Sequence, residues 1–300
     1  MKYDALIYGP IFCDMIFTDL PHMPRLGQEI FAKDLTITVG GSAIVAVGLH
    51  RLGAKVGLIA DLGNDPMSQL MADLLKDSGL DLSLVRHHDQ ALPQITVALS
   101  FPEDRAFVTR FERPDTPIDL APILRNHSAK HLHLGSFLGA FDMPDAPTLA
   151  HTAGMTVSLD PGWDEVALRD HRLRDIVSEV DYFLPSRSEL CAMMETEDVQ
   201  QALTQATTLM HRGTVVMKDG PNDAIASDQN HQVSVPALSV SPVDTTGAGD
   251  SFDAGFIYSL VNGNDLKTNM TYGAICGALT TTVVGGAIGT PTLEEVQKWL

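Results

Sequence analysis

The chain has 300 residues, enough for one large or two small domains with a hydrophobic core. Its 20 Lys and Arg against 38 Asp and Glu leave a formal charge of −18, which repels nucleic acid and anionic membrane surfaces. No apolar stretch reaches bilayer length, so we expect no nucleic-acid partner and no membrane partner. A phosphate site in so acidic a chain must be built from backbone N–H groups, helix N-termini or a bound cation.

The N-terminus and the cysteines favour a cytoplasmic location. The segment Met1 to Asp4 has an acid where a signal peptide has a basic flank, and the apolar run 5–8 stops at Gly9-Pro10, which predicts a first strand. The three cysteines are too far apart for a CxxC metal motif and odd in number. We therefore expect reduced, buried thiols.

Short apolar runs alternate with amphipathic stretches along most of the chain. The run 54–60 is followed by Asp65-Pro66 and by apolar residues at helical spacing up to Gly79. Similar strand-like runs occupy 131–134, 155–159, 182–184 and 214–217. Repeated β–turn–α units predict an α/β fold with a central, mostly parallel sheet flanked by helices in three layers.

Two stretches interrupt this alternation, at about 15–39 and 94–113. In the second, two strand-like runs flank Pro102-Glu103-Asp104, which predicts a hairpin. We assign both stretches to a small β-sheet lid inserted in a single domain that spans 1–300. Exposed strand edges on such a lid favour a homodimer formed through it.

The strongest chemical signal is the segment Asp244 to Asp250, DTTGAGD, which leads into a helical apolar pattern. The N–H groups of Gly247, Ala248 and Gly249 can approach an anion closely at the helix N-terminus. Asp250 would then lie beside a bound phosphoryl group, able to accept a proton from an attacking hydroxyl. The alternative is a glycine turn in which Asp250 only begins a helix.

Other nucleotide motifs are absent from the sequence. No Gly-Lys pair occurs, which excludes a Walker A loop. GAGDSF does not complete GxGxxG, because Phe occupies position 252, and a dinucleotide fingerprint belongs in an early β–turn–α unit.

Over its whole length the chain resembles the PfkB, or ribokinase-like, small-molecule kinases. Asp244 to Phe256 matches their DTTGAGDxFxAGF signature in full. The segment Val39-Gly40-Gly41 with the glycines and acid that follow it, up to Asp65, is similar to their N-terminal signature. The resemblance implies a ribokinase-like three-layer α/β sandwich with a small β-sheet lid.

The resemblance also implies a role for each matching residue. Asp250 would be the catalytic base, with Gly247, Ala248 and Gly249 as the anion hole. Asp14, Gly40 and Gly41 would bind the substrate. The nucleotide-binding positions would be Lys218, Gly220, Thr246 and Gly273. Glu189 would act on magnesium indirectly, and Asp244 with Thr246 would hold a monovalent cation such as potassium.

Several positions depart from the family pattern. Val45 stands where an Asn usually contacts substrate hydroxyls, and Ser186 replaces the Asn of the NxxE motif that ends at Glu189. The loop after Lys218 lacks its final glycine at Asp223, and Gly273 stands where an adenine-side Asn is common. These changes concern substrate and nucleotide contacts more than the class of reaction.

Two further groups of residues favour structural roles. His131 and His133 share one strand face without other ligands at zinc spacing, so we expect structural histidines. The lid residues Arg105, Arg110 and Arg113 alternate with acids, which favours a self-neutralised hairpin surface.

We therefore predict a kinase that transfers the terminal phosphoryl group of ATP, as its Mg²⁺ complex, to a hydroxyl of a small sugar or sugar-like substrate. One alternative is a nucleoside kinase, in which Val45 and the aromatic lid residues Phe101, Phe107 and Phe111 make a more apolar pocket. A second alternative is a catalytically inactive sensor that binds a sugar or nucleotide and regulates a partner.

Overall fold

The computed structural model describes residues 2–101 and 105–300. Within these ranges it has a large sheet with the strand order β13-β12-β11-β10-β9-β8-β1-β4-β5. In chain order these strands are β1 (Ala5–Tyr8), β4 (Val56–Leu62), β5 (Val85–His87), β8 (His131–Leu134), β9 (Thr156–Leu159), β10 (Tyr182–Phe183), β11 (Thr214–Met217), β12 (Ala224–Ser227) and β13 (Gln232–Val235). The strands from β5 to β11 are parallel, and β12 and β13 add an antiparallel edge.

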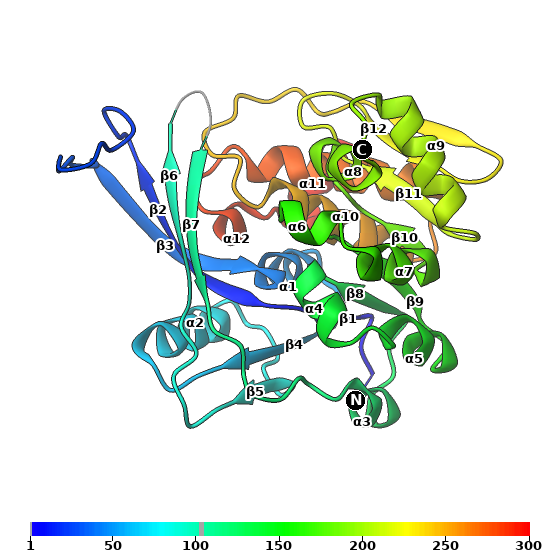
Figure 1. The fold of residues 1–300 in the computed structure, drawn as a ribbon, viewed down its shortest axis with the longest axis horizontal. Helices are drawn as coiled ribbons and strands as arrows, with labels where there is room; N and C mark the ends of the chain where they lie inside the picture. Colours follow the sequence, from blue (N-terminus) through cyan, green and yellow to red (C-terminus); the bar gives the residue numbers. More distant parts are fainter. Residues whose placement is uncertain (1, 102–104) are drawn as a thin grey trace.

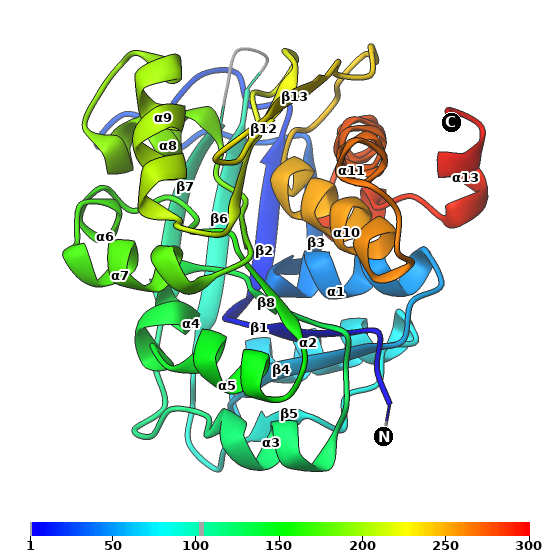
Figure 2. The same ribbon diagram turned by 90° about the vertical axis from the view of Figure 1, so that its right-hand side faces the viewer.

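Helices cover both faces of the large sheet (Figures 1 and 2). One face packs against α1 (Ser42–Arg51), α2 (Pro66–Asp77), α10 (Ala248–Val261) and α11 (Leu266–Thr280). The short helices α12 (Gly286–Gly289) and α13 (Leu293–Gln297) follow α11. Along the other face lie α3 (Leu120–Asn126), α4 (Phe137–Asp142), α5 (Ala146–Thr152), α6 (Glu165–Leu168), α7 (His171–Glu179), α8 (Arg187–Met194) and α9 (Val199–Leu209).

The two apolar cores follow from the period of two along each strand. On β1, Ala5 and Ile7 join the core under α1 and α10, whereas Leu6 and Tyr8 join the opposite core. A strand with helices on both faces must be apolar at consecutive positions, as 5–8 are. The predicted three-layer α/β architecture is thereby confirmed.

The strand positions agree closely with the prediction. Runs 131–134 and 214–217 are strands as expected, and the run predicted at 54–60 begins two residues later, at Val56. Asp65 caps α2 by accepting hydrogen bonds from the N–H groups of Met67 and Ser68, both at 3.1 Å. No helix in the described ranges has the length and apolar character needed to cross a membrane.

The smaller sheet has the order β3-β2-β6-β7 within the described residues. Its strands are β2 (Ile11–Thr18), β3 (Asp34–Gly41), β6 (Gln94–Ser100) and β7 (Arg105–Phe111). It begins at Ile11 rather than near residue 15, because alternation between its two faces starts directly after Gly9-Pro10. β6 and β7 pair as the predicted antiparallel hairpin, whose turn at 102–104 lies outside the described residues.

Candidate active site

The carboxyl ends of the parallel strands meet at one edge of the large sheet, and the chemistry-bearing residues gather there. Asp160 follows β9, and Lys218 follows β11. The first turn of α10 adds Asp250 at the same edge, and β2 of the small sheet places Asp14 close enough for the charge of Asp250 to act on it. Such an edge is where open α/β sheets bind ligands.

An anion cradle forms at the start of α10, because no side chain caps this helix. Its N-cap residue, Gly247, has φ of +72°, in the left-handed region that disfavours other residues. A Cβ at Gly247 would also lie 2.8 Å from Cα of Gly286 and 2.9 Å from Cδ1 of Ile44. The uncapped N–H groups and the helix dipole together favour a bound anion.

Asp250 is a carboxylic acid that can change its protonation near neutral pH. Burial and the negative charge of Asp160 together raise its pKa to about 7, against the opposing effect of the Lys218 ammonium. A general base works best with a pKa close to the working pH. The side chain therefore fits the task of taking a proton from a hydroxyl at the cradle.

Asp14 lies across from Asp250 on β2 and is only 7% exposed. Burial raises its pKa to about 7, helped by the charges of Asp250 and Asp244. Its carboxylate lies against the backbone of Gly40 on β3, where any Cβ would overlap it. Gly41 follows as the N-cap residue of α1, so the two glycines of the N-terminal signature bring the backbone up to the carboxylate.

A polar stripe beside Asp14 was missed by sequence reasoning. Strand register pairs Asp14 with Thr38 on β3 and with Thr96 on β6, and pairs Thr96 with Thr109 on β7. Paired residues lie on one face of a sheet, so these hydroxyls share the face of Asp14, and Oγ1 of Thr96 is 3.2 Å from Oγ1 of Thr109. Their alternation with apolar residues was the available signal.

Arg105 and Phe107 continue this face toward the end of the small sheet. The guanidinium of Arg105 donates a hydrogen bond to Oγ1 of Thr245, in the loop before the anion cradle. Arg113 pairs with Asp142 of α4, and Arg110 pairs with Glu112. The expected self-neutralised hairpin surface was therefore wrong for Arg113, because its side chain reaches past the hairpin to α4. For Arg105 it stays a prediction, since the hairpin acids at 103 and 104 lie outside the described residues.

Lys218 lies in a different environment from the one expected of a nucleotide ligand. Its Nζ donates to Oδ2 of Asp160 at 2.7 Å and to Asp253 at 3.0 and 3.3 Å. The Lys218 side chain is 10% exposed and that of Asp253 is fully buried. The ammonium is thus occupied by two carboxylates inside the protein.

The other predicted nucleotide positions are divided between surface and core. Gly220 is exposed, with φ of +53° and open space around it. Gly273 is buried on α11, where a Cβ would lie 3.0 Å from the ring of Phe252. At this position glycine allows α11 to approach α10.

The predicted cation residues join two loops. One oxygen of Asp244 accepts from the N–H and hydroxyl of Thr246 at 3.0 and 2.7 Å, and the other accepts from the N–H of Gly285 at 3.0 Å. Asp244 thereby ties the loop before α10 to the loop before α12. A monovalent cation at this place stays a prediction from the resemblance.

Glu189 forms a capping box with Ser186 at the start of α8: its carboxylate accepts from the N–H of Ser186 at 2.7 Å, and its own N–H donates to the Ser186 hydroxyl at 3.3 Å. Burial and the charge of Asp160 raise the pKa of Glu189. Val45, the other departure from the family pattern, is buried in the apolar core.

His131 and His133 lie in the interior, consistent with structural roles. His131 is hydrogen bonded to Thr156 and Ser158, and His133 to Ser158. Burial lowers the pKa of His131 to about 3 and that of His133 to about 4, so both imidazoles are neutral. Neutral buried histidines add no positive charge to the site.

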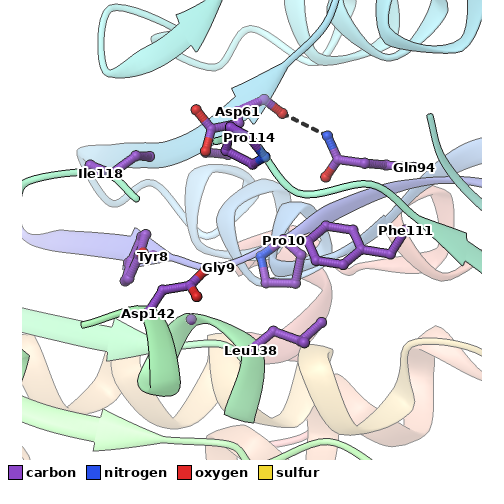
Figure 3. A pocket seen from close by; sticks show the side chains of 12 residues that line it. Tyr8, Gly9, Pro10, Asp61, Gln94, Phe111, Pro114, Ile118, Leu138 and Asp142 are labelled. Carbon is purple, nitrogen blue, oxygen red and sulfur yellow. Dashed lines mark hydrogen bonds between the residues drawn. The ribbon is translucent and has the colours of Figure 1, made fainter. Parts of the chain in front are cut away.

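Figure 3 shows a cavity where the small sheet joins the large one. Its volume is about 30 Å³, and it is lined by the ends of β1 and β4, by Gln94 and Phe111 of the small sheet, and by α4. The amide of Gln94 donates to the carbonyl of Asp61 across it at 2.9 Å. A space of this size holds one or two water molecules and is too small for a sugar.

The chemistry of the site suits a cation bound together with phosphates. Across the described residues, no three His, Cys, Asp or Glu side chains form a cage that could hold a metal by themselves. Yet Asp160, Glu189, Asp250 and Asp253 surround one buried ammonium, and three of the four have raised pKa values. Mg²⁺ is commonly held by one or two carboxylates together with waters and substrate phosphates, and Glu189, whose carboxylate does not pair with Lys218, fits that role.

The family model for pfkB family carbohydrate kinases matches residues 5–293. The chain belongs to this family. It is accordingly a phosphotransferase with a hydroxyl acceptor, a kinase of sugars or nucleosides.

Relatives of this pfkB protein have differing substrates in their names. An ATP-dependent ribose-1-phosphate kinase from Halopiger xanaduensis is 30% identical over 93% of this chain and 92% of its own length. A probable fructokinase-7 from Arabidopsis thaliana is 28% identical over 87% of this chain and 83% of its own.

Solved structures confirm the ribokinase-like fold. Arabidopsis thaliana ribokinase, complexed with ribose and ATP, has a TM-score of 0.82 at 22% identity over 99% of this chain and 98% of its own. An Escherichia coli chain assigned to ribokinase II, in complex with ATP and Mg²⁺, has a TM-score of 0.82 at 23% identity over the same shares. A Methanocaldococcus jannaschii nucleoside kinase has a TM-score of 0.76 at 19% identity over 98% and 97%.

The raised pKa of Asp14 predicts a stability effect that depends on pH. A carboxyl whose pKa is higher in the folded than in the unfolded chain destabilises the fold progressively as pH rises between the two values, here about 4 and 7. Asp14→Asn removes this cost. Its free energy of unfolding, relative to the unaltered protein, should rise by roughly 1.4 kcal/mol per pH unit over that window and level off above it.

Denaturant unfolding of both proteins from pH 4 to pH 8 measures this difference. Asp73→Asn, an exposed acid on α2, is the control and should show no such trend. A constant difference, or one that falls with pH, would contradict the buried, disfavoured charge of Asp14.

Proposed function

We propose that this kinase transfers the terminal phosphoryl group of ATP to a hydroxyl of a small sugar or sugar-like substrate bound between Asp14 and Asp250. The observation that carries the proposal is the pairing of an uncapped helix N-terminus with a carboxylate of pKa about 7 in its first turn. The cradle offers N–H groups to the transferring phosphate, and the carboxylate offers a proton acceptor.

The residues divide the work of one transfer step. Asp14 accepts hydrogen bonds from substrate hydroxyls over the exposed backbone at Gly40, which orients the acceptor. Asp250 takes the proton of the attacking hydroxyl as its oxygen bonds to the terminal phosphorus, while the bond between that phosphorus and the oxygen bridging to ADP breaks. The N–H groups from Gly247 to Gly249 receive the charge on the transferring group.

The relatives and neighbours support ATP and Mg²⁺ as cosubstrate and cofactor. Both ribokinase-type neighbours described above hold ATP, and the Escherichia coli one holds Mg²⁺ as well. Mg²⁺ would neutralise phosphate charge, and Glu189 is the carboxylate that would hold it through its water shell. We also propose that the chain forms a single domain and that the small sheet is its lid. Closure of this lid over the substrate would exclude water from the reaction.

The nucleoside-kinase alternative rests on Phe107. It lies on the Asp14 face of the small sheet and is 49% exposed. The Arg105 guanidinium lies over its ring, 5.4 Å from the ring centre, so a base would stack on the opposite face of the ring. Phe111 packs instead against Phe12, with ring centroids 5.7 Å apart. The inactive-sensor alternative is disfavoured by the complete pairing of cradle and base.

Asp250→Asn should lower kcat by about 10²- to 10⁴-fold, the usual share of a general base. Asn keeps the shape of the side chain but cannot accept the proton, and loss of one negative charge leaves ATP affinity equal or slightly higher. Turnover and ATP affinity are measured side by side. Glu294→Gln removes a first-turn acid from α13 and should behave as the unaltered protein.

Near-normal turnover of Asp250→Asn would eliminate Asp250 as the base. Loss of folding would instead show that this acid only begins a helix. Asp253 is a poor substitute as base, because it is fully buried and hydrogen bonded to Lys218.

Val45 predicts the result of a substrate screen. Without the usual Asn contact, substrates with fewer hydroxyls, or with an acidic group or base in their place, should have higher kcat/KM than plain ribose. A coupled assay for ADP over ketoses, aldoses, sugar acids and nucleosides measures this, with Asp250→Asn as background. Ribose as best substrate by a wide margin would contradict this interpretation of Val45.

The outer face of the small sheet supports a homodimer formed through the lid. Leu35, Ile37 and Val108 lie on the face opposite Asp14 and are 48%, 36% and 70% exposed. Sedimentation should give a dimer for the unaltered chain and a monomer for Val108→Glu, because a charge opposes burial in an interface. Val166→Glu, at a valine on α6 that is 81% exposed, should remain dimeric, and a monomeric unaltered chain would refute the proposal.

A further inference from the structure

Lys218 joins three elements beneath the active site. It follows β11, its Nζ donates to Asp160 at the end of β9, and the same atom donates to Asp253 on α10. Asp253 lies one helical turn after Asp250. The lysine therefore links the second turn of the helix that carries the base to two strand ends of the large sheet.

The charges in this cluster balance only if it holds one carboxyl proton. Two ionised carboxylates beside one ammonium would leave an uncompensated negative charge in the interior. Burial raises the pKa of Asp253 well above its usual value, whereas for Asp160 the ammonium of Lys218 and hydrogen bonds outweigh burial and lower the pKa. Both carboxyls accept hydrogen bonds from the same atom, Nζ of Lys218, so a proton on Asp253 removes the repulsion between two neighbouring negative charges.

We propose that Lys218, Asp160 and Asp253 form a neutral positioning triad for Asp250, in which Asp160 is ionised, Lys218 is protonated and Asp253 carries the shared proton. The proposal rests on the role of Asp250 as base in the proposed function. The triad fixes the rotation of α10 about its axis and hence the direction of the Asp250 carboxylate. Its zero net charge spares Asp250 a further buried negative neighbour.

The groups that surround the triad are consistent with this charge state. Glu189 faces it from α8, Asp250 from α10 itself and His133 from β8. His133 is neutral, so Lys218 is the cation of this region. A second ionised carboxylate at Asp253 would add negative charge next to Asp160, Glu189 and Asp250 at once.

Replacement of two lysines that hold opposite ends of α10 tests the positioning role. Lys218→Met removes the hydrogen bonds that hold the first turns of α10. Lys130→Met removes the hydrogen bond at the C-terminal end of α10, where Nζ of Lys130 donates to the carbonyl of Val261 at 3.0 Å. Both proteins are assayed well below their midpoints of thermal unfolding. We expect a kcat loss of about 10²-fold or more for Lys218→Met, with KM for ATP and sugar within about 3-fold, and kcat within about 2-fold for Lys130→Met.

A Lys218→Met enzyme with near-normal kcat would overturn the positioning role. So would equal kcat losses in the two variants, because they would show a general effect of lost tethers on α10. A rise in KM with unchanged kcat would return Lys218 to nucleotide binding, which also contradicts the proposal.

Asp253→Asn tests the shared proton, whether or not Lys218→Met folds. An amide keeps one acceptor for Lys218 and one donor for Asp160, so it imitates a protonated Asp253. A carboxyl with a raised pKa destabilises the unaltered protein increasingly above about pH 4. The Tm of Asp253→Asn minus that of the unaltered protein should therefore increase as the pH rises above about 4, by up to roughly 3 °C per pH unit.

An ionised Asp253 would give the opposite result. Asp253→Asn would then have a lower Tm at pH 7 than the unaltered protein, since a buried ion pair had been broken, and the proposal would fail. These unfolding measurements need no substrate. Absence of kinase activity in the unaltered protein would refute the proposed function, while the Tm difference would still decide the protonation of the triad.

Discussion

Crowding of buried carboxylates at the edge of the large sheet is the constraint on which the rest of the site depends. Asp14, Asp160, Asp250 and Asp253 influence one another's ionisation, and among the described Lys and Arg residues only Lys218 is buried with them. A protein that keeps so many acids together loses stability in the free state. Backbone N–H groups at α10, the lysine and a metal-bound phosphate can each offset that loss, and only the last of the three accompanies substrate binding.

Close backbone approach is the second requirement, and it explains the two glycine signatures physically. At Gly40 the carboxylate of Asp14 occupies the space of a Cβ, and at Gly247 the helix start packs against Gly286 and Ile44. The carboxylate of Asp14 is therefore held against main chain, and the start of the helix that carries Asp250 is fixed by its own close packing. Positioning of charge before the reaction is what electrostatic catalysis requires.

The sequence was sufficient to predict the α/β layers, the cradle and the pairing of Asp250 with Gly247, because local patterns determine strand alternation and helix starts. The sequence was not sufficient to predict the contacts of Lys218. The spacing between Lys218 and Gly220 is the same whether the ammonium points outward or inward. Only the fold shows that Asp253, 35 positions later, lies within hydrogen-bond distance. The contact of Arg105 with Thr245 could not be predicted either, because 140 positions separate the two residues in the sequence and only the fold brings them together.

The side chains of the small sheet alternate between two faces. One face carries the proposed substrate contact and the other carries the proposed subunit contact. Asp14 lies on one face of β2, and its neighbour Met15, paired with Ile37, lies on the other. Because a strand moves as one body, a displacement of the outer apolar face also displaces Asp14 relative to Asp250. On the far side of the site, Arg105 links the same sheet to the loop before the cradle. The proposed substrate contact and the proposed subunit contact are thus joined to the loop before the cradle by strands of seven or eight residues, because the carboxylate proposed to bind substrate lies on a sheet with two faces.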